Sequence, residues 1–179
     1  MFEAEIKYLA DGPVTPPGEG LPDAVYRDTY FDSPDGAFTA SGRELRLREA
    51  DGRSRLTYKH PPFDAATGSK EELETLVADG PAMAALLGQL GFVPRQAYAK
   101  RCRCFRDTFR GLALEIAVVA VDFSPEVFVE IEHLAPSRQA ALAALPVIRA
   151  YAASLGLSRE CRQAYTDLFT ASRAKAPGT

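Results

Sequence analysis

The sequence is poor in the residues that build metal–sulfur sites, disulfide frameworks and membrane spans. Only three of its 179 residues are cysteine and only two are histidine. Neither set shows the paired ligand spacing of a zinc site, and an odd number of cysteines favours the reduced state typical of the cytoplasm. No stretch approaches the roughly 20 apolar residues that a membrane span needs, and the charged opening Met-Phe-Glu-Ala-Glu predicts no secretory signal. We therefore expect a cytoplasmic protein that does not bind membranes.

A strong net charge is also missing. The 21 basic and 24 acidic side chains leave a formal charge of −3, so the chain has no general attraction for nucleic acid. Binding of a polyanion would have to depend on local clusters of Lys and Arg. An apolar fraction of 46% excludes wholesale disorder. The length suits one domain, which we place at residues 1–173, with a frayed tail at 174–179.

Alternation of polar and apolar residues predicts a chain made mainly of strands. Residues 9–23 are rich in Pro and Gly and predict a loop, whereas residues 70–77 are ambiguous between strand and helix. Asp51-Gly52 predicts a tight hairpin, and Pro146 is expected to kink or divide its helix. The predicted strands are 2–8, 25–32, 44–49, 53–59, 97–106, 112–121 and 127–132, and the predicted helices are 81–90, 137–155 and 159–173.

Like charges recur two residues apart along several of these strands. Such pairs project from one face, roughly 6.5–7 Å apart, and they repel each other unless opposite charge lies between them. Paired carboxylates favour a hard divalent cation such as Mg²⁺ or Mn²⁺, whereas clustered Arg and Lys favour phosphate. The acidic doublets are Glu3/Glu5, Glu72/Glu74 and Glu130/Glu132, and the basic ones are Arg46/Arg48 and Arg101/Arg103. Arg55 and Lys59 also share one face of their strand.

On any single strand, this alternation fits an ordinary sheet with one face in water. Its recurrence favours a sheet closed on itself with the charged faces inward, so that an acidic side holds metal and a basic side holds polyphosphate. The apolar faces would then point outward, covered by the Leu- and Ala-rich helices. Cys102 and Cys104 alternate with Arg101 and Arg103, so they would point at those helices and pack there.

Several segments, in order along residues 3–168, resemble the CYTH superfamily. These are the triphosphate tunnel metalloenzymes, which include class IV adenylyl cyclases and thiamine triphosphatases. Residues 3–7 (Glu-Ala-Glu-Ile-Lys) are similar to the Glu-x-Glu-x-Lys signature of that family, and residues 128–132 (Phe-Val-Glu-Ile-Glu) to its F-x-E-x-E segment. The other matching segments are 28–32 (Asp-Thr-Tyr-Phe-Asp), 42–48 (Gly-Arg-Glu-Leu-Arg-Leu-Arg), 57–59 (Thr-Tyr-Lys), 100–103 (Lys-Arg-Cys-Arg) and 163–168 (Gln-Ala-Tyr-Thr-Asp-Leu).

The resemblance implies an α+β fold in which eight antiparallel strands form a closed barrel, or tunnel, with a polar interior and helices outside. It implies Mg²⁺ or Mn²⁺ as the cofactor and a small molecule containing a triphosphate as the partner, and it leaves a homodimer open. Carried over by position, the metal ligands would be Glu3, Glu5, Glu130 and Glu132, with Glu5 and Lys7 catalytic. The substrate-binding residues would be Lys7, Arg46, Arg48, Arg55, Lys59, Glu72, Glu74, Lys100, Arg101 and Arg103.

The sequence departs from the family pattern in two places. Residues 9–23 lack the helix that usually follows the first strand. The strand before Glu130, residues 114–122, has no acid where the family carries a metal-binding Asp. Either Glu115 or Asp122 replaces that Asp after a shift in register, or one ligand is absent.

Three functions fit these patterns. Hydrolysis of a triphosphate is favoured, because it requires only the tunnel itself. A class IV adenylyl cyclase, which converts ATP into cyclic AMP and pyrophosphate, is the alternative within the same enzyme class. A non-catalytic module that binds polyphosphate or nucleotide is the third, motivated by the missing Asp.

Overall fold

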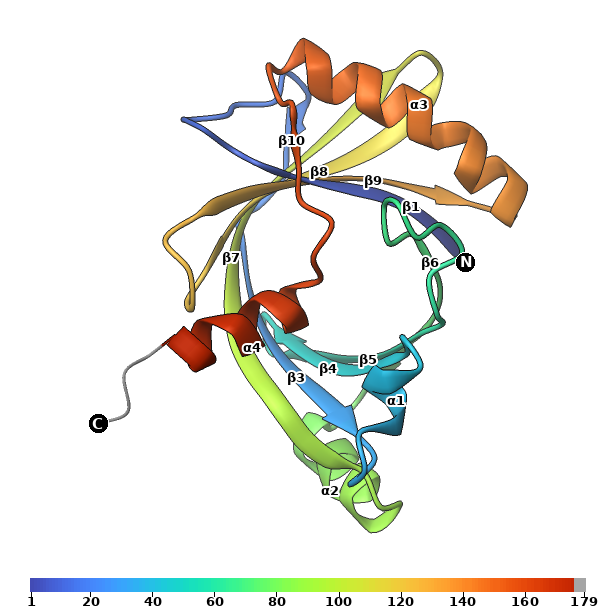
Figure 1. Ribbon diagram of the computed structural model, residues 1–179, viewed down its shortest axis with the longest axis vertical. Coiled ribbons are helices and arrows are strands. Elements are labelled where there is room, and N and C mark those ends of the chain that lie inside the picture. The colour runs from blue at the N-terminus through green and yellow to red at the C-terminus, as the bar shows by residue number, and fades with distance from the viewer. Residues whose placement is uncertain (176–179) are drawn as a thin grey trace.

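The computed structural model describes residues 1–175 and consists of a ring of antiparallel strands with helices around it (Figure 1). Each strand alternates between one face toward the inside of the ring and one face toward the outside. The ring strands are β1 (Phe2–Leu9), β3 (Ala24–Asp32), β4 (Glu44–Ala50), β5 (Arg53–Lys59), β6 (Lys70–Val77), β7 (Val93–Phe109), β8 (Leu112–Val121) and β9 (Val127–Ala135).

The strands follow the order β1-β6-β5-β4-β3-β7-β8-β9, and β9 pairs with β1 along its whole length, which closes the barrel. The predicted α+β fold with an eight-stranded antiparallel barrel is therefore confirmed. Two short strands extend it: β2 (Glu19–Gly20) pairs with β7, and β10 (Arg159–Glu160) pairs with β1. The helices are α1 (Ala37–Ala40), α2 (Gly80–Gln89), α3 (Arg138–Ser154) and α4 (Tyr165–Lys175).

The hairpin turns follow from local chemistry. Asp51 and Gly52 join β4 to β5 with φ angles of 50° and 70°, the left-handed pair that a two-residue hairpin turn requires. Arg110 and Gly111 join β7 to β8 in the same way, with φ angles of 50° and 80°. These turns fix which residues face each other across each hairpin.

Several boundaries differ from the sequence-based expectation. Residues 70–77, which were ambiguous, form strand β6. The predicted helix at 159–173 was wrong at its start, because Arg159 and Glu160 pair with β1 and α4 begins at Tyr165. Pro146 lies inside α3 and does not divide it. Helix α4 continues to Lys175 and so includes the first two residues of the predicted tail, and residues 176–179 lie outside the described part.

Helix α3 covers one side of the barrel. Ser137 caps it by accepting a hydrogen bond from the backbone amide of Ala140 (3.2 Å). Its apolar face packs on the outer faces of β1, β8 and β9, where Ile148 shares one buried cluster with Ile6 and Ile131. Within residues 1–175, no helix is both long and apolar enough to cross a bilayer.

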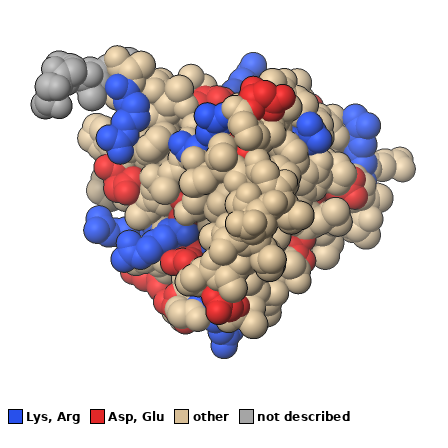
Figure 2. All heavy atoms as spheres, turned by 90° about the horizontal axis from the view of Figure 1, so that it is seen from below, with Lys and Arg blue, Asp and Glu red and all other residues tan. Residues whose placement is uncertain are grey.

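Helix α2 covers the opposite side. Asp79 caps it by accepting a hydrogen bond from the amide of Ala82 (2.9 Å), and Leu87 packs with Leu45 and Leu47 of β4. The helix contains no charged residue. Figure 2 views the molecule from this side and shows a broad uncharged surface bordered by acidic and basic side chains.

Candidate active site in the barrel cavity

A cavity of about 570 Å³ lies inside the barrel. It collects charged side chains from strands that are far apart in the sequence, because closing the sheet turns one face of each strand toward the same space. Twelve of the fourteen predicted site residues line this barrel cavity: Glu3, Glu5, Lys7, Arg46, Arg48, Arg55, Lys59, Glu72, Glu74, Lys100, Glu130 and Glu132.

Glu3, Glu5 and Glu132 form a carboxylate cluster, in which oxygens of the three side chains all lie within 4.8 Å of one another. Glu5 is directly opposite Glu132 in the β1–β9 pairing. Burial, reinforced by the neighbouring carboxylates, raises the pKa of Glu3 and of Glu5, and it raises that of Glu132 to about 7. Three partly buried carboxylates this close are costly unless a cation or protons compensate them, and an all-oxygen donor set suits Mg²⁺ or Mn²⁺.

Glu130, the fourth predicted metal ligand, lies in a different environment. Its carboxylate accepts a hydrogen bond from Lys100 at 3.1 Å. Burial opposes ionisation here, but Lys100 and Lys7 outweigh it and lower the pKa of Glu130 to about 2. Glu130 is therefore ionised and paired, and it stands apart from the carboxylate cluster.

Arg46 is the most buried arginine of the cavity, with only 6% of its surface exposed. Its Nη2 donates to the hydroxyl of Thr57 at 3.3 Å, whereas its Nε has no hydrogen-bond partner among residues 1–175. A buried guanidinium donor without an acceptor costs free energy. An anion in the cavity would remove that cost.

Arg48, two residues along the same strand, is already neutralised. Its Nε and Nη2 each donate to a carboxylate oxygen of Asp28, both at 2.7 Å. Burial opposes ionisation of Asp28, but Arg48 and Arg46 lower its pKa below the ordinary value. No role for Asp28 was predicted from the sequence. Its place opposite Arg48 in the β3–β4 pairing is the signal that could have identified it.

Lys59 pairs with carboxylates from two other strands, β1 and β6. Its ammonium lies 3.4 Å from a carboxylate oxygen of Glu3 and also forms an ion pair with Glu72. Although burial disfavours the charged form, Glu3 and Glu72 raise the pKa of Lys59 well above its ordinary value. Lys59 likewise outweighs burial at Glu72 and lowers the pKa of that carboxyl to about 2.

Two further ion pairs lie along this part of the cavity. Arg55 and Glu74 are 2.5 Å apart at the rim, with side chains 48% and 34% exposed. Glu44 and Lys70, which were not among the predicted site residues, pair at 2.5 Å with both side chains largely buried. Positive and negative side chains therefore alternate in this part of the cavity, instead of forming one acidic side and one basic side as predicted.

The C-terminal segment enters the cavity, contrary to the prediction that residues 159–173 cover the outside. Residues 161–167 line the cavity, and α4 lies at the barrel opening beside β7 (Figure 1). The ammonium of Lys7 donates to the backbone carbonyl of Gln163. The Tyr165 ring lies under two ammonium groups, with its centroid 4.0 Å from Lys7 Nζ and 3.7 Å from Lys100 Nζ.

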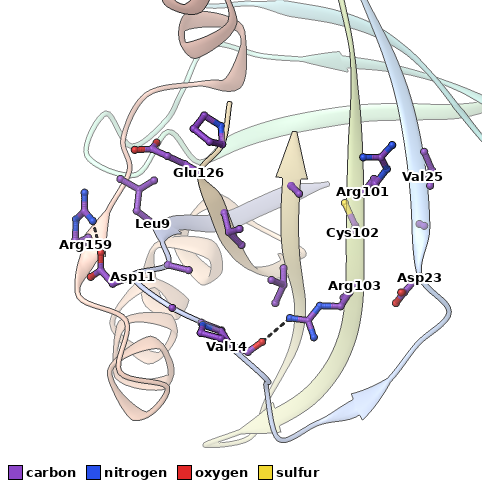
Figure 3. Close-up of a pocket in the computed structure, with 18 residues that line it drawn as sticks. Leu9, Asp11, Val14, Asp23, Val25, Arg101, Cys102, Arg103, Glu126 and Arg159 are labelled. Atoms are coloured by element: carbon purple, nitrogen blue, oxygen red, sulfur yellow. Dashed lines mark hydrogen bonds and ion pairs between the residues drawn. The ribbon is translucent and has the colours of Figure 1, made fainter. Parts of the chain in front are cut away.

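Arg101 and Arg103 do not reach the barrel cavity, and their predicted inward orientation was wrong. Both are exposed, and both line a separate pocket of about 710 Å³ on the outside of the barrel. Figure 3 shows Arg103 turned toward the loop after β1, where its Nη2 donates to the carbonyl of Val14 at 2.8 Å. Lys100 and Cys102 occupy the inner face of β7 instead.

The cysteine prediction was right about packing for Cys102 but wrong about the face on which it packs. Cys102 is 3% exposed and belongs to an apolar cluster with Tyr98, Phe128 and Tyr165, so it packs inside the barrel and not under the outer helices. These aromatic groups from β7, β9 and α4 supply the apolar surroundings that the cysteine side chains need on the inner face. The inner and outer faces of β7 are thus the reverse of those predicted.

The structure places both candidates for the missing Asp, and neither belongs to the carboxylate cluster. Ala117 is opposite Glu130 in the β8–β9 pairing, and Glu115 is opposite Glu132. Glu115 lines the cavity, half-exposed, and pairs with Arg106 at 2.9 Å. Asp122 instead accepts a hydrogen bond from the backbone amide of Ala99. Glu115 is therefore the acid that lies nearer the carboxylate cluster in the pairing, and Asp122 supports the backbone.

The CYTH domain family matches residues 1–163, nearly the whole chain, so the protein belongs to the CYTH family. Among solved structures, the PH1819 protein of Pyrococcus horikoshii is similar, with a TM-score of 0.82, 24% identity, and coverage of 96% of this chain and 99% of that one. A candidate adenylate cyclase from Vibrio parahaemolyticus has a TM-score of 0.78 at 20% identity, covering 95% and 98%.

Two other proteins have descriptions that name an activity. A Hippeastrum protein described as an adenylyl cyclase candidate with a dominant triphosphatase activity has a TM-score of 0.65 at 19% identity, covering 96% of both chains. The candidate adenylate cyclase MJ0240 of Methanocaldococcus jannaschii is 35% identical over 65 residues. That match covers 36% of this chain and 37% of the relative. At these identities the solved structures establish the fold alone.

Proposed function

We propose that the protein is a Mg²⁺- or Mn²⁺-dependent triphosphatase that binds a triphosphate in the barrel cavity and hydrolyses its terminal phosphate. The observation that carries the proposal is the pairing, in one cavity, of a three-carboxylate cluster with a buried guanidinium that lacks an acceptor at Nε. The carboxylate cluster favours a hard cation, and the guanidinium favours an anion. A metal-bound triphosphate satisfies both.

Each group has a distinct role in this proposal. Glu3, Glu5 and Glu132 would hold the divalent cation, which when bound offsets the charge of the phosphates. Arg46 binds a phosphate through the Nε that is free in the structure. The ammonium groups of Lys7 and Lys100 lie against the Tyr165 ring, and that of Lys100 pairs with Glu130. They can neutralise charge that develops on the departing diphosphate.

Hydrolysis itself needs little beyond this placement. A water oxygen forms a bond to the terminal phosphorus, the bond from that phosphorus to the bridging oxygen breaks, and the proton of the water passes to a carboxylate or to solvent. Positioning and charge neutralisation dominate catalysis of such a transfer. We propose Glu5, from the carboxylate cluster, and Lys7, next along the same strand face, as the catalytic residues.

Adenylyl cyclase activity is the second candidate, because the local relative of 35% identity is described as a candidate adenylate cyclase. In that reaction the ribose 3′-hydroxyl of ATP attacks the innermost phosphorus and pyrophosphate leaves. A binding module without catalysis is the third candidate, favoured by Ala117 standing opposite Glu130 where an acid was expected.

One assay separates the three. The protein is incubated with inorganic triphosphate, ATP or thiamine triphosphate, each with Mg²⁺ or Mn²⁺, and phosphate, pyrophosphate and cyclic AMP are measured. Phosphate release that EDTA abolishes supports the proposal. Cyclic AMP with pyrophosphate would instead identify a cyclase, and binding without turnover would identify the module.

Glu5→Gln tests the carboxylate cluster, because it removes one charge and keeps the shape. We expect it to abolish turnover while triphosphate binding is partly retained. Glu115→Gln is the matched control on the neighbouring strand, since Glu115 lies outside the cluster and is half-exposed. Wild-type turnover in the Glu5 variant would refute the metal assignment.

A further inference from the structure

The C-terminal segment contributes an aromatic ring, that of Tyr165, to the cavity. Tyr165 is 7% exposed, and its ring packs edge-on against Phe128 with centroids 5.2 Å apart. The Tyr165 ring, which belongs to helix α4, therefore contacts side chains of three barrel strands, β1, β7 and β9. If Tyr165 only closed the barrel opening, its ring would not need to lie against charged groups.

Two lysines converge on that ring. Lys7 Nζ lies 4.0 Å and Lys100 Nζ 3.7 Å from the ring centroid, both closer than the ~6 Å at which cation–π attraction is significant. Lys7 and Lys100 are 7% and 5% exposed, so water screens their mutual repulsion only weakly. The negative face of the ring offsets part of that repulsion, and Glu130 offsets more from the Lys100 side.

The backbone of the same segment fixes one of these ammonium groups. The carbonyl of Gln163 accepts a hydrogen bond from Lys7, and the side chain of Gln96 on β7 holds the segment in place by donating to the Thr166 carbonyl (3.1 Å) and the Thr170 hydroxyl (2.9 Å). The position of Lys7 therefore depends on where residues 163–170 are docked.

We propose that Tyr165 is a positioning residue of the phosphate site, whose ring holds the ammonium groups of Lys7 and Lys100 together as one cationic binding point for a triphosphate. The inference rests on the proposed function, because it concerns how the same cavity binds its anion. It assigns to α4 a part in substrate binding. Removal of the ring should weaken phosphate binding through the loss of its contacts with the two lysines.

The test measures binding of inorganic triphosphate by calorimetry in EDTA, so that no metal or turnover is needed. Tyr165→Leu, which removes the ring, should weaken binding about tenfold, the equivalent of one favourable buried cation–π contact. Tyr165→Phe keeps the ring and should stay within about threefold of wild type. Phe169→Leu is the matched control, because Phe169 is on the same helix but packs against Tyr98 and Phe123.

A double-mutant cycle distinguishes positioning from general damage to the fold. If Tyr165 acts through the lysines, its loss should cost little more once Lys100 is replaced by Ala, because coupled residues give non-additive effects. Should Tyr165→Leu fail to fold, pentafluorophenylalanine at position 165 keeps the shape of the ring and reverses its charge distribution, and it should weaken binding by a similar factor.

The possible outcomes separate the two claims. If wild type binds triphosphate with Mg²⁺ but not in EDTA, the inference is overturned and the proposed function stands. If it binds under neither condition, both fail. If wild type binds and Tyr165→Leu binds equally well, only the inference is overturned. Equal losses in Tyr165→Phe and Tyr165→Leu, or full additivity with Lys100→Ala, would also overturn it.

Discussion

Strands β4 and β7 carry the same Arg-x-Arg doublet and use it in opposite ways. Arg46 and Arg48 on β4 point into the barrel cavity, whereas Arg101 and Arg103 on β7 point away from it. The difference lies in the residues between them. Leu47 on β4 packs outward against α2, but Cys102 on β7 packs inward against aromatic side chains that include one from α4.

The comparison teaches that alternation defines two faces but does not say which face is inside. On both strands a basic face alternates with a less polar one, so the local pattern is the same. What differs is where an apolar surface is available to receive the less polar face. For β7 this surface is inside the barrel, and the inward cation is Lys100.

The largest effect should follow from breaking the inner doublet at Arg48. Arg48→Ala leaves the carboxylate of Asp28, which is fully buried, without its two charge-assisted hydrogen bonds. Loss of one partner of a buried ion pair costs about 3 kcal/mol. Chemical denaturation should show that decrease in the free energy of unfolding, and an unchanged stability would mean that the pair is solvated.

The next effect concerns the binding of substrate rather than stability. Arg46→Ala should raise KM for triphosphate about 100-fold, since it removes a buried charge-assisted hydrogen bond worth about 3 kcal/mol. The turnover number should change less, because the contact is made in the ground state as well. Arg101→Ala, the same substitution on the outer face, is the control and should stay within about twofold in steady-state kinetics.

A third prediction concerns the acid side of the stability profile. The pKa of Asp28 is lowered in the folded protein, so its contribution to stability is complete above its unfolded pKa of about 3.9 and is lost as pH falls through the lower folded-state pKa. Asp28→Asn should therefore flatten the loss of unfolding free energy below about pH 4. Denaturation midpoints measured from pH 7 to pH 3 for both proteins check this, and parallel curves would contradict it.

The smallest effect is expected on the outer doublet. Arg103→Ala removes one hydrogen bond to the carbonyl of Val14 at an exposed site, which is worth about 1 kcal/mol or less. Triphosphate binding should be unchanged. If this substitution weakened binding as much as Arg46→Ala does, the distinction between the two doublets would be lost.

Much of the barrel was predictable from local sequence. The strands 44–50 and 53–59 and their Asp51-Gly52 turn follow from alternation and from a turn pair that favours positive φ. Eleven charged residues predicted on strands β1, β4, β5, β6 and β9 do line the cavity. The short strand at 159–160 was not predictable, because two residues carry no periodic signal and pair only through β1.

By itself, the sequence determined which side chains share a face, where the hairpins turn, and that the chain carries acidic and basic doublets in a closed sheet. Only the tertiary structure decided that Lys100 rather than Arg101 and Arg103 faces the cavity, that Asp28 neutralises Arg48, and that Tyr165 enters from the C-terminal helix. The physical reason is that the inside of a barrel is defined by closure and by what packs on each face. Both depend on contacts between segments far apart in the sequence.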